Sequence, residues 1–593
     1  MRVGDLSFRI RAVESVLIAN RGEIAVRVIR AAHDLGLRAI AVYSELDRDA
    51  VHVDLADEAW NVGPGPSAES YLNIPKILEV AAASNADAIH PGYGFLAENA
   101  GFATAVINAG LIWVGPPPEA IATMGDKIAS RAAAEAAGVP TVPGTMEPLT
   151  EVDQVAAFAE DHGFPIAIKA AHGGGGKGLK VVRSPDELDA AFESAKREAD
   201  AWFANPEVYV ERYLDNARHI EAQIIFDKHG NGQFLGERDC SMQRRHQKLI
   251  EETPAPFFTS KQRSRLGKAA LAVARAAAYE NAGTVEFLMD EKGNLYFLEM
   301  NTRIQVEHTI TEEATGIDLV AEQLRVAAGE ELSFDDVDAR GHVMEFRINA
   351  EDPARGFLPT PGTLSRYREA AGRGIRVDSG VRQGSSISQY YDTLIAKLIV
   401  SGRDRSETIA RAKRALAEFD IGGVDTTIPA HLTILDNEDF VAGRISTRLV
   451  EDSMDFTHLA TKTAPALPED TELQERNITV EVGGQRYEVR YWSEVIAPTT
   501  SGQRPAPRRR APKLSERSGG QGGEGIVTAP MQGTIVKVHH GAGDAVVAGE
   551  PVCILEAMKM ENEIKAPNDG EIVDLRVQPG DTVTSGAVLM VIR

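Results

Sequence analysis

The sequence predicts an α/β multidomain protein that carries an all-β flattened barrel at its C-terminal end. Near the N-terminus, buried-strand patterns alternate with helical patterns, which is typical of a parallel sheet. Residues 165–182 hold two strand patterns around a glycine-rich loop. Residues 526–593 contain two halves in which matching residues, such as Gly533 and Gly570, recur at a constant offset of 37. The 593 residues are also too many for a single core.

The composition argues against several classes of protein. Hydrophobic residues make up 43% of the chain and charged residues 25%, which is ordinary for a globular protein. No apolar run approaches the ~18 residues of a membrane helix, and no signal peptide is recognisable. The net charge of −24 argues against nucleic-acid binding. Two cysteines, Cys240 and Cys553, cannot form a disulfide framework, which indicates a cytoplasmic location.

The first region is expected to be a parallel sheet with a site at one edge. Residues 15–19 and 37–43 have strand patterns, and residues 23–35 have a helical pattern. Crossover connections place the carboxyl ends of such strands along one edge, where ligands bind. Asn20-Arg21-Gly22 and Pro91-Gly92-Tyr93-Gly94 follow strands, so we expect both at that edge. The first turn lacks the GxGxxG pattern of a nicotinamide site.

The glycine-rich loop is interpreted as a lid over a triphosphate. A strand over residues 165–170, which carries Lys169, precedes it, and a strand over residues 179–182 follows. Consecutive glycines let backbone N–H groups approach an anion without interference from a Cβ atom. The loop is not a Walker A motif, because its lysine is followed by glycine rather than Ser or Thr. An inert linker is the alternative, although such linkers are seldom clamped between two strands.

Three strand patterns carry acids, of which Glu211 is expected to point away from its apolar neighbours. Residues 208–214 include Glu211, and residues 284–288 include Glu286. Glu299 and Asn301 lie two apart in the next strand, hence on one face. Carboxylate and amide oxygens suit Mg²⁺, with phosphate as a co-ligand. A structural salt bridge to an arginine is the alternative.

A basic stretch and a later segment favour an anion pocket. Residues 238–248 contain four cations, and a solvated basic loop is the alternative for them. Arg303, Gln305 and Glu307 continue the strand alternation, so we expect all three to face one way. A small planar anion could be held by Arg303 and Lys248 while Glu307 removes its proton. The four cations of residues 238–248 are Arg238, Arg244, Arg245 and Lys248. Cys240 lies in the same stretch, but no residue supplies a dedicated base for it, which argues against its acting as a nucleophile.

Two segments before the barrel carry less chemistry. Residues 478–482 and 487–492 alternate around Gly483-Gly484, which predicts a β-hairpin that docks another subunit or caps the preceding lobe. Residues 497–525 are rich in proline and glycine and cannot form a core, so we expect a flexible linker. The Arg508-Arg509-Arg510 cluster at its centre is either solvated or contacts an acidic partner surface.

Lys559 falls where the first half of the C-terminal repeat meets the second. Ala529-Pro530 recurs as Ala566-Pro567, and strand patterns broken by Gly-Asp turns predict a barrel of two halves. We therefore expect Lys559, between Met558 and Met560, on an exposed tight turn. A solvated lysine between two core methionines is the alternative.

Several motifs resemble those of biotin-dependent carboxylases. The segment around Lys559 resembles the biotin carrier domain; the lysine of a lipoyl carrier usually follows Asp instead. Residues 15–450 resemble the biotin carboxylase subunit, an ATP-grasp enzyme. Besides the glycine loop, the motifs that carry this resemblance are MGDK (124–127), RDCSMQRRHQK (238–248), EMNTRIQVEH (299–308) and EFRINAED (345–352).

The resemblance implies six regions. They are an N-terminal biotin carboxylase (pre-ATP-grasp) domain (15–126), an ATP-grasp domain with the glycine-rich lid (127–342), a C-terminal carboxylase domain (343–452), a small hairpin region (453–496), a linker (497–525) and a biotin carrier domain (526–593).

The resemblance also implies roles for individual residues. Glu307 is expected to be the general base, and Lys559 the biotinylated residue. Two departures from the family pattern, Arg212 and Ala171-His172, affect an adenine contact and the entry to the lid. ATP contacts are expected from Lys127, Lys169, Gly174, Gly175, Gly176, Glu211, His219, Gln243, Glu286 and Glu299. Ligands of Mg²⁺ or Mn²⁺ are expected to be Glu286, Glu299 and Asn301. Bicarbonate and biotin contacts are expected from Lys248, Arg303, Gln305, Val306, Arg347 and Tyr93, with Lys248, Arg303 and Arg347 also catalytic.

The architecture as a whole resembles the α chain of bacterial acyl-CoA carboxylases. Its resemblance implies MgATP-dependent carboxylation of biotin by bicarbonate through carboxyphosphate, and delivery to a separate carboxyltransferase β subunit that acts on acetyl-CoA or propionyl-CoA. A methylcrotonyl- or longer acyl-CoA carboxylase is the alternative. Biotin protein ligase and a second copy of the chain are the other expected partners, and a single-chain pyruvate carboxylase is not expected. Another ATP-grasp ligase and a silent scaffolding subunit are alternatives from other classes.

Overall fold

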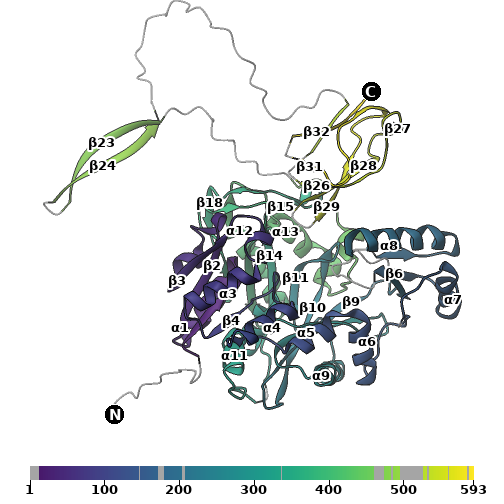
Figure 1. Ribbon diagram of the computed structural model, residues 1–593, viewed down its shortest axis with the longest axis horizontal. Coiled ribbons are helices and arrows are strands. Elements are labelled where there is room, and N and C mark those ends of the chain that lie inside the picture. The colour runs from purple at the N-terminus through teal and green to yellow at the C-terminus, as the bar shows by residue number, and fades with distance from the viewer. Residues whose placement is uncertain are drawn as a thin grey trace, which may run out of the picture. The chain divides into compact units, whose positions relative to one another are not determined.

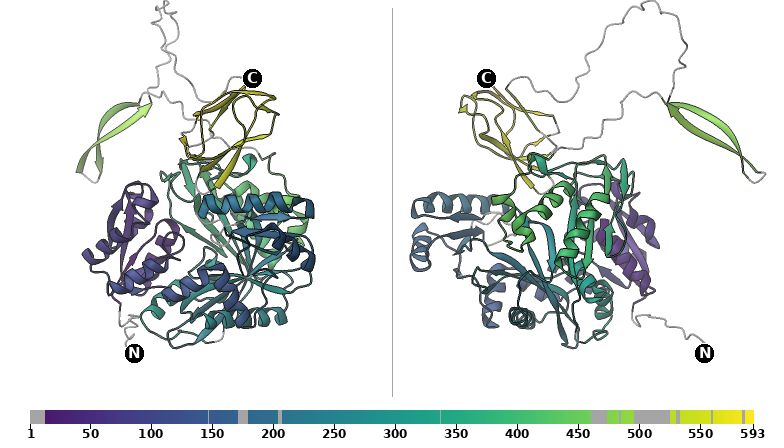
Figure 2. Two further views of the ribbon diagram at one scale, coloured as in Figure 1. Left: turned by 45° about the vertical axis from the view of Figure 1, so that its right-hand side comes forward. Right: turned by 180° about the vertical axis from the view of Figure 1, so that it is seen from behind.

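The computed structural model describes residues 13–145, 147–170, 179–203, 207–335, 337–459, 473–482, 485–494, 525–529, 533–557, 560–583 and 586–593. The chain divides into two compact units, Met1–Thr461 and Lys462–Arg593. Figure 1 labels the elements of both units, and Figure 2 shows them from two further directions.

The first unit begins with a parallel sheet, as predicted. Its strands are β1 (Ser15–Ile18), β2 (Arg38–Ser44), β3 (Glu58–Gly63), β4 (Ala88–His90) and β5 (Ile112–Trp113), in the order β3-β2-β1-β4-β5. Its helices are α1 (Gly22–Asp34), α2 (Val51–Leu55), α3 (Ile74–Ala83), α4 (Ala100–Asn108) and α5 (Pro118–Gly125). The Asn20 amide donates to the carbonyls of Pro91 at 2.7 Å and Tyr93 at 2.8 Å, so the two predicted turns meet at one edge.

A small antiparallel sheet follows. It contains β6 (Ile166–Ala170), β7 (Lys180–Val182) and β8 (Val208–Arg212), in the order β7-β6-β8. The helices α7 (Val152–His162) and α8 (Leu188–Phe203) lie beside it (Figure 1), and α6 (Lys127–Ala136) precedes it. The strands predicted on either side of the glycine loop are thus confirmed, whereas the loop itself lies outside the described residues.

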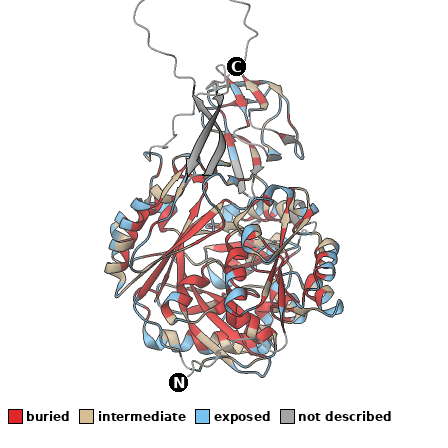
Figure 3. Cartoon of the chain, turned by 90° about the vertical axis from the view of Figure 1, so that its left-hand side faces the viewer, coloured by how far each residue is buried: buried red, intermediate tan, exposed pale blue. Residues whose placement is uncertain are grey.

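An eight-stranded antiparallel sheet forms the centre of the first unit. Its strands are β9 (Arg218–Phe226), β10 (Gly232–Arg244), β11 (Gln247–Thr253), β12 (Asn281–Met289), β13 (Leu295–Asn301), β14 (His342–Asn349), β19 (Ile375–Ser379) and β21 (Leu394–Gly402). The order is β13-β12-β9-β10-β11-β14-β21-β19. Because β11 pairs with β14, the sheet runs without a break from the predicted ATP-grasp region into the C-terminal lobe. Most of its residues are coloured as buried in Figure 3.

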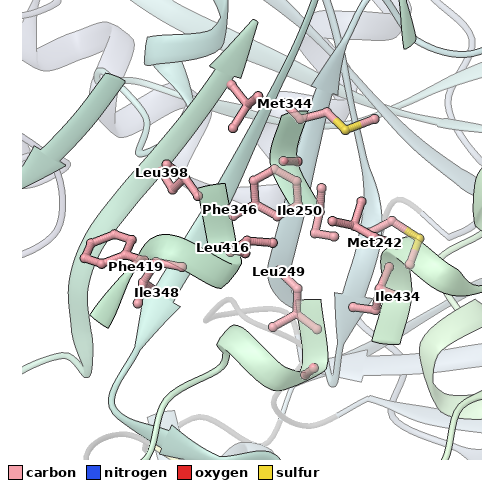
Figure 4. Packing of buried hydrophobic residues seen from close by; sticks show 14 of the residues in the cluster. Met242, Leu249, Ile250, Met344, Phe346, Ile348, Leu398, Leu416, Phe419 and Ile434 are labelled. Atoms are coloured by element: carbon pink, nitrogen blue, oxygen red, sulfur yellow. The ribbon is translucent and has the colours of Figure 1, made fainter. Parts of the chain in front are cut away.

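Helices and short strands surround this sheet. Side chains of β11, β14 and β21, including Ile250, Phe346 and Leu398, meet those of α12 and α13, such as Leu416 and Ile434, in one apolar core (Figure 4). The helices are α9 (Ser260–Ala276), α10 (His308–Thr315), α11 (Leu319–Ala327), α12 (Arg405–Glu418), α13 (Ile428–Asp436), α14 (Glu438–Val441) and α15 (Leu449–Ser453). The short strands are β15 (Glu351–Asp352), β16 (Leu358–Pro359), β17 (Gly362–Thr363), β18 (Arg366–Arg368), β20 (Ser386–Ile387) and β22 (Asp420–Gly422).

The predicted hairpin is confirmed in the second unit. Strands β23 (Leu473–Val482) and β24 (Gln485–Glu494) pair antiparallel along their whole length. The predicted linker falls almost wholly outside the described residues. No helix among those residues combines the length and apolar character that a membrane span needs.

The C-terminal barrel confirms the internal repeat. One half contains β25 (Ile526–Thr528), β26 (Gly533–Val538), β27 (Ala545–Val546) and β28 (Pro551–Ala557); the other contains β29 (Met560–Lys565), β30 (Gly570–Leu575), β31 (Thr582–Val583) and β32 (Val588–Ile592). β26 and β30 begin and end 37 residues apart, and so do β27 and β31. The two four-stranded sheets, β25-β32-β30-β27 and β29-β28-β26-β31, each take strands from both halves. The barrel is therefore one interleaved fold rather than two hairpin modules.

Candidate active site

Many of the predicted site residues lie on consecutive strands of the central sheet. Side chains alternate between the faces of a strand, so polar residues can line one region only where the registers of neighbouring strands match. Register pairs Gln243 with Lys248 across β10 and β11, and Glu286 with Glu299 across β12 and β13. The residues brought together in this way are His219, Gln243, Lys248, Glu286, Glu299, Asn301 and Arg347.

Glu307 is buried between two cations. It stands directly before α10, where Lys248 Nζ donates to its Oε1 at 2.5 Å and Arg347 Nη2 donates to its Oε2 at 2.9 Å. Burial alone would raise the pKa of the carboxyl, but Lys248, Arg347 and Arg238 outweigh burial and hold that pKa well below its usual range. Glu307 is therefore ionised at neutral pH, as a general base must be before it accepts a proton.

Lys248 is the cation shared by the acids of this region. Besides Glu307, its ammonium donates to Glu221 at 2.8 Å and lies 3.3 Å from Glu286. Burial would lower the pKa of Lys248, but the Cys240 thiol and the surrounding carboxylates raise it well above its ordinary value. An anion entering the site would thus meet a fixed positive charge.

Glu286 and Glu299 form an acidic pair suited to a divalent cation. Burial and then the neighbouring Glu286 raise the pKa of Glu299, which shows that the two carboxylates repel each other. The Asn301 and Gln305 amides each donate to Glu286 at 2.8 Å, and His219 lies 2.8 Å from its other oxygen. The basic partners of Glu286 are thus a lysine and a histidine rather than an arginine. A hard cation would relieve the repulsion, so the three predicted ligands fit Mg²⁺.

Arg347 is hydrogen-bonded through both its guanidinium and its backbone carbonyl. Its guanidinium donates to Glu251 at 2.7 Å as well as to Glu307. Its carbonyl accepts hydrogen bonds from Thr427 at 2.7 Å and from His431 at 2.8 Å. A cation fixed in this way can stabilise negative charge that develops beside Glu307 without first reorganising.

The predicted ATP contacts of the small sheet form a second cluster. Lys169 on β6 donates to Glu211 on β8, and Arg131 donates to the other oxygen of Glu211 at 3.3 Å. Burial lowers the pKa of Lys127, against the smaller opposing effect of Glu299, so this lysine lies near the acidic pair. Gly174, Gly175, Gly176 and Lys559 lie outside the described residues.

Residues 302–307, called the base loop below, do not continue β13. The predicted alternation was wrong because β13 ends at Asn301, and these residues form turns instead. Arg303 donates to Asn301 and to Glu98, both at 3.0 Å, while Gln305 reaches Glu286. The loop brings Gln305 and Glu307 to the acids of the sheet by a different path from the one predicted.

The four cations of the basic stretch lie in different surroundings. Arg238 is fully buried and donates to Glu221, Gln223, Thr284, Gln305 and Thr311. Arg244 stacks on Phe357, and the Arg245 side chain is exposed. Of the four cations, Lys248 is the one that donates directly to Glu286 and Glu307. Cys240 is buried, and burial raises the pKa of its thiol, which argues against a nucleophilic role.

Two residues that the sequence did not single out support the site. Glu221, two residues after His219, accepts from Arg238 at 2.5 Å and from Lys248 at 2.8 Å. Glu98, from the loop before α4, holds Arg303. The spacing from His219 could have indicated Glu221, whereas no local signal identifies Glu98.

Lys397 and Glu23 connect Val306 with Tyr93. Lys397 Nζ donates to the Val306 carbonyl at 2.8 Å and lies 3.3 Å from Glu23. The Tyr93 hydroxyl donates to the same carboxylate, Glu23. Tyr93 is thus joined to the base loop rather than contacting Lys248 or Arg347 directly.

Four family models match the chain. Residues 12–121 match "Biotin carboxylase, N-terminal domain", and residues 126–334 match "Carbamoyl-phosphate synthase L chain, ATP binding domain". Residues 345–452 match "Biotin carboxylase C-terminal domain", and residues 526–592 match "Biotin-requiring enzyme".

Several known proteins are similar over long stretches. The biotin-dependent acyl-coenzyme A carboxylase alpha3 subunit of Mycobacterium leprae is 50% identical over 98% of this chain and 99% of its own length. Biotin carboxylase 1 of Bacillus subtilis is 50% identical over 74% of this chain and 98% of its own. Among solved structures, the biotin carboxylase–βγ-ATP complex from Campylobacter jejuni superposes with a TM-score of 0.72 at 44% identity, over 74% of this chain and 98% of that one. The biotin carboxylase domain dimer of the Hydrogenobacter thermophilus 2-oxoglutarate carboxylase, with MgADP and bicarbonate, gives 0.72 at 46% identity over the same shares.

These matches cover both units, and they confirm the predicted fold. The chain belongs to the α subunits of biotin-dependent acyl-CoA carboxylases, and it is an ATP-dependent ligase in which an ATP-grasp biotin carboxylase is joined to a biotin carrier domain.

Proposed function

We propose that this chain uses MgATP and bicarbonate to carboxylate a biotin held on Lys559, and passes the carboxyl group to a separate carboxyltransferase β subunit. The observation that carries the proposal is the ionised Glu307, fixed between Lys248 and Arg347 beside the acidic pair of Glu286 and Glu299. This arrangement supplies a base, an anion pocket and a cation site within one buried region.

The first step activates bicarbonate. Lys248, Arg303, Gln305 and the backbone of Val306 bind the anion, and Glu307 accepts its proton. The deprotonated oxygen then attacks the γ-phosphoryl group of ATP to give carboxyphosphate. Lys169 and Lys248 neutralise charge on the transferring group. Glu286, Glu299 and Asn301 would hold Mg²⁺ or Mn²⁺, which would neutralise further negative charge on the phosphates.

The second step transfers carbon dioxide. Carboxyphosphate breaks down to CO₂ and phosphate. Bound biotin would supply the ureido nitrogen to which the CO₂ is added, and the released phosphate would take the proton that this nitrogen loses. Arg347 is proposed to stabilise the negative charge that develops on the ureido oxygen, because its guanidinium is fixed beside Glu307 by its bonds to Glu251 and Glu307. Tyr93 contributes to the biotin side of this pocket, and the glycine lid with Gly174, Gly175 and Gly176 covers the phosphates and excludes water.

Delivery completes the proposed function. The barrel carries biotin attached by a biotin protein ligase, and the linker lets it visit the β subunit, for which acetyl-CoA or propionyl-CoA is the proposed acceptor. A methylcrotonyl- or longer acyl-CoA is the alternative. The β23–β24 hairpin is proposed as a subunit-docking element, and the carboxylase part as a homodimer. The proposed location is the cytoplasm.

The test uses the full chain co-produced with a biotin protein ligase. Phosphate release from MgATP should require both bicarbonate and free biotin, and an acyl-CoA panel assayed with the β subunit should identify the acceptor. Release that proceeds equally well without bicarbonate would contradict the proposal. An avidin-negative chain would contradict the role of Lys559.

A further inference from the structure

Lys397 is a fully buried lysine to which the mechanism above gives no role. It lies on β21, where it is the register partner of Arg347 on β14 and of Asp378 on β19. None of its side-chain surface is exposed. Lysines are rarely buried in this way, because a desolvated ammonium is costly unless it is paired and hydrogen-bonded.

The contacts of Lys397 join two distant parts of the first unit. Its Nζ donates to the Val306 carbonyl at 2.8 Å and lies 3.3 Å from Glu23 Oε2 on α1. Glu23 also accepts the hydroxyl proton of Tyr93. Tyr93, Glu23, Lys397 and Val306 therefore form a continuous chain from the turn after β4 to the base loop.

The Val306 carbonyl belongs to the peptide group that joins Val306 to Glu307. A donor fixed on this oxygen sets the orientation of the backbone from which the Glu307 side chain begins. On the other side of Val306, the Gln305 carbonyl accepts from His308 Nδ1 at 2.7 Å. Lys397 and His308 thus hold the two ends of the segment that carries the base.

Glu23 has little room to move. A Cβ atom added to Gly380, just after β19, would lie 2.5 Å from the Glu23 backbone nitrogen, so the start of α1 packs directly on this turn. Burial would lower the pKa of Lys397, but Glu23, Glu345 and Asp378 raise it above its ordinary value, in spite of Arg376. The ammonium therefore stays charged and keeps donating to Val306.

We propose that Lys397 is a positioning residue that fixes the base loop, and that Glu23 acts through it. The inference rests on the proposed function, because it concerns where Glu307 and the Val306 backbone meet bicarbonate. Lys397 touches no reacting atom in this account. Its effect is to hold the base and the bicarbonate contacts in one arrangement.

The test measures phosphate release by the full chain with free biotin, at varied bicarbonate and varied ATP. For Lys397→Met we expect the KM for bicarbonate to rise about tenfold and kcat to fall, with the KM for ATP within about twofold of wild type. Glu23→Gln should raise the bicarbonate KM by a smaller factor, because Lys397 keeps its bond to Val306. If Glu23 acts through Lys397, the double variant should match Lys397→Met rather than add to it.

The double variant also guards against failure to fold. Lys397→Met leaves three carboxylates without their lysine, whereas Lys397→Met with Glu23→Gln removes one charge of each sign. Glu252→Gln is the matched control, since this buried acid pairs with Arg405 at 2.7 Å, and it should lower thermal stability with the bicarbonate KM unchanged. A wild-type bicarbonate KM in the double variant would overturn the inference while leaving the proposed function intact. A wild-type chain without bicarbonate-dependent release would overturn both.

Discussion

The central sheet of the first unit and the carrier barrel differ in the kind of side chain that they bury. Among the residues whose burial the structure describes, every buried polar or charged side chain lies in the first unit, between Ser15 and His431. The barrel core is made of apolar side chains such as Ile535, Leu555 and Leu589. The first unit thus buries charged side chains, whereas the core of the barrel is apolar.

The difference follows from where each region performs its chemistry. Buried charge is costly unless it is paired, so a structure keeps it where a reaction needs fixed charges in a dry pocket. The barrel is proposed to carry its reactive group on Lys559, between β28 and β29 in the sequence, so its core has only to be stable. A variant that alters one of these regions should therefore spare the other.

Glu307→Gln should give the largest effect. The amide keeps the size of the side chain but cannot accept the proton of bicarbonate, so bicarbonate-dependent phosphate release should fall by about 100-fold or more. The barrel should be unaffected, and the variant should still be detected by avidin. Full phosphate release by this variant would show that another group is the base.

Leu589→Ala should destabilise the barrel alone. Leu589 is fully buried in β32, and removing its side chain should cost about 3 kcal/mol of the barrel's free energy of unfolding. Hydrogen exchange should show faster opening of the barrel, with phosphate release from free biotin unchanged. Leu398→Ala, at an equally buried position in β21, is the matched variant and should weaken the first unit instead.

Acid should weaken the first unit more than the barrel. His52, His90 and His431 are fully buried, and burial lowers the pKa of each to about 4. In the unfolded chain histidine titrates near ~6.5, so the unfolded state binds more protons between these values. Each histidine therefore contributes up to about 3 kcal/mol less to stability as pH falls from about 6.5 to about 4. Glu23, Glu251 and Glu345, whose pKa values burial raises, oppose this loss, so the effect of one histidine is the difference in pH slope between wild type and its variant.

The barrel offers a natural control for this pH dependence, because His539 is exposed and His540 is half-buried. Calorimetry at several pH values should show the transition of the first unit falling ahead of the barrel transition. His52→Gln keeps a donor for the Val42 carbonyl and should flatten the slope. Equal acid sensitivity of the two regions would count against buried neutral histidines as the cause.

Lys413→Ala should give the smallest effect. Lys413 on α12 pairs with Asp436 on α13 at 2.5 Å, but both side chains are exposed, at 38% and 74%. Exposed ion pairs contribute little, so the loss should be about 0.5 kcal/mol or less, with activity unchanged. Denaturant unfolding checks this, and a loss as large as that of Leu398→Ala would show that surface charge matters more than we infer.

Much of the fold and part of the site could be predicted from the sequence. The offset of 37 predicted the barrel because a tandem repeat fixes which strands correspond, even though their pairing interleaves the halves. Glu286, Glu299 and Asn301 could be assigned to one site because strand alternation is local. The path of residues 303–307 could not, since it depends on β13 ending at Asn301. The burial of Arg238 could not be predicted either, because the sequence of a charged stretch does not reveal which arginine is paired with a buried carboxylate.

The transfer of carbon from bicarbonate to the carrier can be followed with a radioactive label. The biotinylated chain, incubated with MgATP and radiolabelled bicarbonate, should carry label on the peptide that contains Lys559. The label should be lost in Lys559→Arg and in Glu307→Gln, although Lys559→Arg should still release phosphate when free biotin is added. Label that appears without ATP, or on a peptide other than that of Lys559, would contradict the account.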